Sequence, residues 1–216
     1  MIDIEEEVEF RGGVLLGRTR DDPIEVVSYN RRWPGMFKRM RDRLANALGP
    51  VAVRIDHVGS TAVPGLAAKP IIDIQVSVPD VEDEEAYREA IESCGFTLRY
   101  REAGHRYFRP PADQPRTFQL HVCTVGSKWE HDHLLFRDFL RGHADEAARY
   151  EAIKNDVAGH YRHDRIGYMD AKQPYIENAL GRAEVWADEV GWSRSFSSSR
   201  VRQPRRPPPR LPRARA

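Results

Sequence analysis

The chain has few cysteines and no long hydrophobic segment among its 216 residues. Cys94 and Cys123 fit no metal-finger or redox spacing, so we expect both to be small buried residues. No apolar run approaches the roughly 20 residues that span a membrane. The acidic first ten residues lack the basic and apolar regions of a secretory signal peptide. These absences predict a cytoplasmic protein without a membrane-spanning segment.

Acidic residues are missing from the last part of the chain. Residues 193–216 contain eight arginines and no Asp or Glu. The whole chain carries a formal charge of +1 and this segment carries +8, so residues 1–192 carry −7. An acidic body argues against a dedicated nucleic-acid-binding domain, although the arginines could contact phosphates weakly by electrostatics alone. Because the segment lacks apolar periodicity, we expect a disordered Arg/Pro-rich tail over 193–216.

The remaining pattern predicts an α/β (α+β) fold. We expect a flexible leader over 1–22, then one domain with a sheet half at 23–125 and a helical half at 128–190. The expected strands cover about 24–27, 51–58, 70–78, 97–100, 107–109 and 117–123. The expected helices cover about 34–48, 82–94 and much of 129–190, with breaks near Gly142, Gly167 and Pro174.

The segment from 57 to 74 carries the strongest chemical pattern. Gly59, Ser60 and Thr61 follow an expected strand, where glycine lets the backbone approach an anion and the hydroxyls can donate to it. Lys69 adds a cation, and Asp73 adds a carboxylate on the next expected strand. Hydroxyls, a cation and a carboxylate in one short segment are typical of a Mg²⁺–phosphate site. The alternative is a turn with a solvated lysine and a capping aspartate.

The same segment resembles the signature of the GrpB family, whose fold is that of the nucleotidyltransferase superfamily. Gly59-Ser60 is similar to the Gly-Ser turn of that superfamily, and Asp73 to its first acidic strand position. Further similarity lies in residues 29–34, 119–122, 136–141, 150–154 and 168–172, so the resemblance covers about 23–190. It implies a mixed β-sheet flanked by helices, a helical C-terminal part, and a cleft for a nucleotide or phosphorylated small molecule.

Departures from the superfamily pattern bear on the metal. Gln75 stands where an active two-metal enzyme has a second carboxylate, and Gln119 and His121 stand where the later strand has another. We assign Asp73, Gln75 and His121 as candidate ligands of Mg²⁺, or of Mn²⁺ or another divalent ion, since imidazole suits transition metals better than magnesium. His121 is also a candidate general base. We expect His57 to face the same cleft as a catalytic group, or else to orient the backbone.

Three more residues are candidates for ligand binding. Tyr168 and Lys172 are four apart, so one helical face can present both to a phosphate chain. Arg137 is the third, with surface ion pairs as its alternative role. The run at 130–133 holds two histidines two residues apart, which do not share a helical face. We expect a solvated helix start there and no metal site.

The resemblance leaves the reaction open. One function is that of a metal-dependent enzyme that transfers a nucleotidyl group, with Gly59, Ser60 and Lys69 holding phosphates and Asp73 a metal ion. Another is a non-catalytic accessory module that binds a nucleotide or CoA precursor, as in relatives that resemble domains fused to dephospho-CoA kinase. The missing second carboxylate favours this second function. A third is a different small-molecule enzyme that reuses the cleft.

Overall fold

The computed structural model describes residues 7–16 and 22–193. Its strands form one mixed seven-stranded sheet in the order β1-β2-β5-β6-β7-β4-β3. Strands β4 and β7 are parallel, and the other neighbouring pairs are antiparallel. Five of these strands are β3 (Arg54–Val58), at one edge, and β4 (Ile72–Val78), β5 (Thr97–Glu102), β6 (His105–Arg109) and β7 (Phe118–Thr124). The α+β class and the mixed, helix-flanked sheet predicted from the sequence are confirmed.

A hairpin extends the sheet where the sequence predicts a flexible leader. Its strands are β1 (Glu7–Phe10) and β2 (Gly13–Leu16), so that prediction was wrong for these residues. Arg11 and Gly12 both have positive φ, which suits a two-residue hairpin turn. Leu16 is buried in the main core, which fixes the hairpin against β5. Residues 1–6, 17–21 and the predicted tail from residue 194 onward lie outside the described residues.

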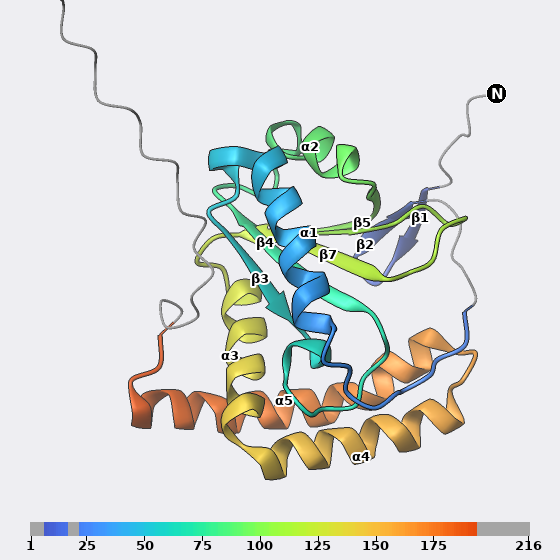
Figure 1. Ribbon diagram of the computed structural model, residues 1–216, viewed down its shortest axis with the longest axis vertical. Helices are drawn as coiled ribbons and strands as arrows, with labels where there is room; N and C mark the ends of the chain where they lie inside the picture. The colour runs from blue at the N-terminus through green and yellow to red at the C-terminus, as the bar shows by residue number, and fades with distance from the viewer. Residues whose placement is uncertain (1–6, 17–21, 194–216) are drawn as a thin grey trace, which may run out of the picture.

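One face of the sheet carries the hydrophobic core. Helices α1 (Trp33–Leu48) and α2 (Arg88–Ser93) cover this face (Figure 1). Alternate residues of β4 and β7 point into it, and Ile74, Val76 and Leu120 are fully buried. These strands resist any shift in register, because a one-residue slip would move every apolar side chain to the other face.

The opposite face is polar and is covered by α3 (Lys128–Gly142). Asp56 on β3 accepts from Arg54 at 2.6 Å, and the Arg137 guanidinium of α3 lies 3.5 Å from the same carboxylate. All three side chains are buried. Buried charges are tolerated when they are paired, so these ion pairs fix α3 on the sheet.

Two long helices lie at one end of the sheet (Figure 1). They are α4 (Ala144–His160) and α5 (Arg165–Val190), and the predicted break near Gly142 is confirmed. The predicted break near Gly167 is also found, since α4 ends at His160 and α5 begins at Arg165, whereas the predicted break near Pro174 was wrong. The Gly167 N–H is capped by the Asp164 carboxylate in the first turn of α5, and α5 continues through Pro174 because its neighbours pack against α4.

Other sequence predictions differ from the structure in detail. Residues 24–27 form only an isolated bridge between Val27 and Ala68, and 82–94 divides into the short helices η3 (Glu84–Ala86) and α2. Both cysteines are buried and form no disulfide, as predicted. Among the described residues, every helix is too short or too polar to cross a membrane.

The core face makes a stability prediction with a matched control. Val76→Ala removes two methyl groups from a fully buried site and should lower the free energy of unfolding by about 2 kcal/mol. Val53→Ala makes the same change at a side chain that is 41% exposed and should cost less than about 0.5 kcal/mol. Urea unfolding of both variants checks the difference. Equal losses would contradict the placement of the core.

Candidate functional site

The site lies where β3 ends and β4 begins. Val58 pairs with Asp73, and the next residue, Gly59, turns the chain into the short helix η2 (Ser60–Ala62). Gly59 has φ +66°, and a Cβ added there would overlap the Asp73 carboxylate. Glycine is therefore required twice, for the backbone conformation and for the close approach of the turn to Asp73. The turn and the carboxylate predicted to act together are in contact.

The pairing of β4 with β7 gathers the predicted metal ligands on the polar face. Asp73 pairs with Gln119, and Gln75 pairs with His121. All four side chains point to the same face because β4 and β7 are parallel and in register. His121 Nε2 lies 4.0 Å from Asp73 Oδ1. The Gln75 amide is fully buried, and neither its oxygen nor its nitrogen has a hydrogen-bond partner among the described residues.

Asp73 is a partly exposed carboxylate, with 27% of its side chain accessible. The Gln119 amide, oriented with its nitrogen toward Asp73, donates to Oδ1 at 2.9 Å, and its oxygen accepts from Arg116. Burial raises the pKa of Asp73 to about 6, against the opposing effect of Lys69, Arg116 and Lys172. The carboxylate is thus ionised at neutral pH within a ring of positive charge.

Lysines from three elements surround a pair of tyrosines. Lys69 and Lys172 lie 4.9 and 4.2 Å from the centre of the Tyr168 ring, and Lys154 lies 4.8 Å from that of Tyr150. Burial lowers the pKa of Lys69 and of Lys154 to about 7, and that of Lys172 to about 8. Mutual repulsion adds to this effect at Lys69 and Lys154. The fold therefore holds three cationic groups close together in surroundings that disfavour their charge.

The hydroxyl turn faces the same tyrosines. The Ser60 side chain hydrogen bonds with Tyr150, whose pKa is raised by burial. Lys154 donates to the Ala67 carbonyl oxygen, and the Ala67 N–H donates to Glu151 at 2.7 Å. Lys154 and Glu151 thus tie the loop after η2 to α4. Of the predicted residues, Gly59, Ser60, Lys69, Asp73, Gln75, His121, Tyr168 and Lys172 come together here.

Three predicted site residues have structural roles instead. His57 pairs with Ile74, so it points to the core face, where it stacks on Phe37 at 4.7 Å. Thr61 is buried and hydrogen bonds with the His57 ring at 2.9 Å. Burial lowers the pKa of His57 to about 3. His57 therefore does not face the cleft, and the prediction that it acts beside Asp73 was wrong.

Arg137 is also structural. Its guanidinium donates to the His57 carbonyl oxygen at 3.0 Å and pairs with Asp138 at 2.7 Å. Only 4% of its side chain is exposed, so it offers little to a ligand. The sequence suggested surface ion pairs for Arg137, but the residue lies between α3 and the sheet, in contact with β3.

Two arginines that the sequence analysis missed extend the positive region. Arg116 precedes β7, and Arg165 begins α5; both lower the pKa of Lys69 by charge repulsion. With Lys69 they line a cavity of about 250 Å³. Its other lining residues are Asp22, Pro23, Ile24, Glu25, Pro70, Ile71 and Pro115. Arg116 had one sequence signal, since the start of a strand parallel to β4 lies at the same sheet edge as Asp73.

A separate group of potential metal ligands lies between α3 and α5. One ligand atom each from His131, Asp132 and Glu184 lies within 4.8 Å of the others. His131 contacts Glu184 at 2.9 Å, and Lys128 contacts Asp132 at 2.5 Å. The sequence predicted a solvated helix start at 130–133, and this was wrong: Glu130 is buried and the other three side chains are only partly exposed, because α3 packs against the sheet and α5.

Comparison with known proteins gives one consistent family. A family model described as GrpB protein matches residues 23–182. A UPF0157 protein of Streptomyces coelicolor is 43% identical over 169 residues, covering 78% of this chain and 89% of its own. The crystal structure of the conserved protein GrpB from Enterococcus faecalis has a TM-score of 0.67 and 29% identity, covering 75% of this chain and 99% of that chain. A dephospho-CoA kinase of Mycolicibacterium paratuberculosis is 31% identical over 196 residues, covering 79% of this chain and 48% of its own.

The buried Lys154 predicts a pH dependence of stability. Its folded-state pKa of about 7 lies below the ordinary 10.5, so the unfolded chain binds the extra proton between these values. The free energy of unfolding should therefore rise with pH from about 7 toward 10. Lys154→Met should make this rise shallower, whereas Lys38→Met, at a largely exposed side chain, should not. Urea unfolding at pH 7, 8 and 9 measures the slopes, and identical slopes in all three proteins would refute the assignment.

Proposed function

The chain belongs to the GrpB family, and from the geometry of its cleft we propose that it binds a phosphorylated small molecule, with a nucleotide as the preferred class. The observation that carries this proposal is the crowding of Lys69, Lys172 and Arg116 around one partly exposed carboxylate, Asp73. Cations that repel one another in a cleft are relieved by an anionic ligand, so binding energy is available for phosphates.

The residues divide the work by their chemistry. Lys69 and Lys172 both lie over the Tyr168 ring, where each can meet a phosphate oxygen as a point charge. Arg116 and Arg165 line the adjoining cavity, where their guanidinium groups could bind further anionic groups of the ligand. Gly59 lets the turn approach the Asp73 carboxylate closely, because a side chain there would overlap that carboxylate. A phosphate chain running from Tyr168 toward this cavity could meet Lys69, Arg116 and Arg165.

The donors also fit one divalent cation. Asp73 offers a carboxylate oxygen, His121 offers a ring nitrogen 4.0 Å away, and the Gln75 amide lacks any partner among the described residues. Such an ion would neutralise phosphate charge beside Asp73. A second ion is not favoured, because Gln75 supplies no charge. The lysines can neutralise phosphate oxygens in its place.

Catalytic transfer and binding alone remain two candidate functions for the cleft. Transfer of a nucleotidyl group would use Asp73 and the lysines to stabilise charge and His121 to accept a proton. Two observations favour a non-catalytic accessory module that binds a nucleotide or CoA precursor. Gln75 replaces a carboxylate, and the dephospho-CoA kinase relative matches this chain over only 48% of its own length. A domain carried within a longer kinase can serve by binding alone.

Ligand-dependent stabilisation tests the binding proposal. Melting temperatures are measured with nucleoside triphosphates and CoA precursors, each with and without Mg²⁺ or Mn²⁺. A ligand at 100 times its Kd should add about 2.7 kcal/mol of stability. Lys69→Met and Lys172→Met should each lose most of the shift because they remove a phosphate contact, and Lys38→Met, on the surface of α1, should keep it. Absence of any shift in the wild-type protein would sink the proposal.

Replacing the amide at position 75 separates the two candidates. Gln75→Asp buries a second carboxylate two residues from Asp73, so it should lower the melting temperature without metal and recover it when Mn²⁺ is added. Recovery would show that the cleft retains the geometry of a two-ion site, which supports transfer. A loss that Mn²⁺ does not repair would favour the accessory module. Gln119→Asp is the control, because it introduces a carboxylate beside Asp73 at a partly exposed position, whereas Gln75 is fully buried.

A further inference from the structure

Lys69 belongs to two groups of cations. Its ammonium group lies 4.9 Å from the centre of the Tyr168 ring, and Lys172 lies 4.2 Å from the centre of the same ring. Lys69 also lines the cavity of about 250 Å³, together with Arg116 and Arg165. Neither Tyr168 nor Lys172 lines that cavity. One group of cations therefore lies over Tyr168 and the other lies in the cavity, and Lys69 is common to both.

The sheet holds Arg116 in place. The Tyr107 hydroxyl accepts from Arg116 Nη2. The Gln119 carbonyl oxygen, in the amide orientation given above, accepts from Arg116 Nε at 3.0 Å and from Nη2 at 2.8 Å. These contacts occupy one edge of the guanidinium group. The third nitrogen, Nη1, has no acceptor within the part of the chain that the structure describes. Arg116 is thus fixed and still has donors for a ligand.

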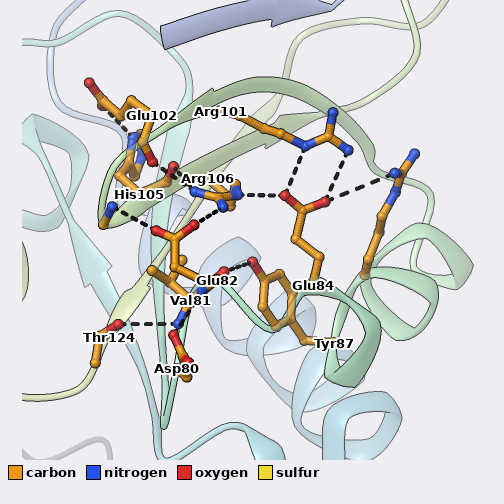
Figure 2. A network of polar contacts seen from close by, with 12 residues as sticks. Asp80, Val81, Glu82, Glu84, Tyr87, Arg101, Glu102, His105, Arg106 and Thr124 are labelled. Atoms are coloured by element: carbon orange, nitrogen blue, oxygen red, sulfur yellow. Dashed lines mark hydrogen bonds and ion pairs between the residues drawn. The ribbon is translucent and has the colours of Figure 1, made fainter. Parts of the chain in front are cut away.

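Arginines elsewhere on the sheet are paired with carboxylates. Figure 2 shows Arg101 and Arg106 beside Glu84, with their Nε atoms 2.8 and 2.6 Å from Glu84 Oε1. By contrast, neither Lys69 nor Arg116 forms an ion pair with a carboxylate among the described residues. A cation that is partly withdrawn from water and lacks a counterion is unfavourable. An external anion would therefore be stabilised beside these two side chains.

Two carboxylates also line the cavity, but they do not balance its cations. Glu25 is 58% exposed and pairs with Arg162 at 3.2 Å. Arg165 Nη2 lies 3.4 Å from the backbone carbonyl oxygen of Asp22, which anchors the arginine to the cavity wall. Three cations of the lining thus face Asp22 and a Glu25 whose charge Arg162 already balances. The cavity keeps a net positive charge.

The remaining walls are apolar, and the cavity is small. They are formed by Pro23, Ile24, Pro70, Ile71 and Pro115. A volume of about 250 Å³ is below the roughly 300–1,000 Å³ of sites that enclose a drug-sized ligand. The cavity therefore admits one small group of a ligand and not a whole nucleotide.

The apolar wall also constrains how that group is joined to the rest of the ligand. Pro70 and Ile71 connect Lys69 with β4, which carries Asp73. A phosphate oxygen against these two side chains would lose water without gaining a donor, which is costly. The part of the ligand that links the Asp73 cleft with the cavity is therefore uncharged, as a sugar is.

We propose that the cavity is a second anion subsite, which binds a phosphate group that the ligand carries apart from the phosphates beside Asp73. The ligand class is then a nucleotide with phosphate at two positions of its sugar, such as a nucleoside 3′,5′-bisphosphate. Arg116 and Arg165 bind the second phosphate, since a guanidinium fork matches phosphate oxygens, and Lys69 contacts both groups. Joining two anionic groups in one molecule strengthens the binding of each. This inference rests on the proposed function and narrows its ligand.

Free phosphate tests the subsite without any nucleotide. The full-length protein is labelled with ¹⁵N in its arginines, and the Nε–Hε signals are followed as inorganic phosphate is added. Arg116→Lys, Arg165→Lys and Arg39→Lys each identify one signal by its loss. We expect the Arg116 and Arg165 signals to move saturably, and the signal of Arg39, exposed on α1, to stay still. If neither cavity signal moves, the subsite is refuted.

Two nucleotides that differ by one phosphate test the ligand class. Adenosine 3′,5′-bisphosphate should bind about ten-fold or more tightly than adenosine 5′-monophosphate, because charged hydrogen bonds to the second phosphate are added. Isothermal titration calorimetry measures both affinities, and their ratio is the readout, since a general loss of positive charge weakens both ligands alike. Equal affinities in the wild-type protein would overturn the proposal.

Variants then locate the second phosphate. Arg165→Gln should reduce the affinity ratio to about three-fold or less, and Arg116→Gln should reduce it in the same way, because each removes a guanidinium from the cavity. Arg39→Gln removes the same charge from the helix on the opposite face of the sheet and should keep the wild-type ratio. A ratio that both cavity variants leave unchanged would place the second phosphate elsewhere and contradict the proposal.

These experiments separate the inference from the proposed function. If neither nucleotide binds while free phosphate still moves the Arg116 and Arg165 signals, the proposed function fails and the anion subsite stands. If both nucleotides bind with equal affinity, the second subsite fails and the proposed function stands.

Discussion

The parallel pairing of β4 with β7 is the constraint on which the candidate site depends. It places Asp73 beside Gln119 and Gln75 beside His121, and it turns Ile74 into the core on the other face. The same register therefore satisfies hydrophobic burial and assembles the polar group. A slip of one residue would exchange the two faces and bury Asp73 among aliphatic side chains, at a cost that no local contact could offset. The geometry of the cleft is thus maintained by packing on the face that no ligand touches.

The sequence predicts the part of this arrangement that lies in one strand. The run from Ile72 to Val78 alternates polar and apolar residues, so its strand and its polar side are visible without a structure. The same reasoning failed at β3, where all five residues are buried and polar side chains occur on both faces. His57 and Asp56 then look equivalent in sequence. Only the antiparallel pairing of His57 with Ile74 shows that His57 belongs to the core.

Two arginines that line the cavity beside the cleft were hard to find from the sequence for a different reason. Arg116 lies in a loop and Arg165 at the start of α5, and neither belongs to a periodic pattern or a motif. Arg165 reaches Lys69 because α5 begins at the end of the sheet, and Arg116 reaches it because β7 begins beside β4. The hairpin at 7–16 is a similar case, because its short strands carry a weak pattern and gain their stability from pairing with β5 and from Leu16 in the core.

Two polar regions on the same face of the sheet differ in how their buried charges are balanced. Under α3, Arg54 and Arg137 both face Asp56, so the buried charges compensate one another and hold a helix in place. At the end of the sheet, three lysines share Asp73 and Glu151 with two arginines nearby, and burial lowers the pKa of each lysine. A fold gains nothing in stability from crowding like charges. An anionic ligand of the kind proposed above would turn this unfavourable arrangement into a favourable one.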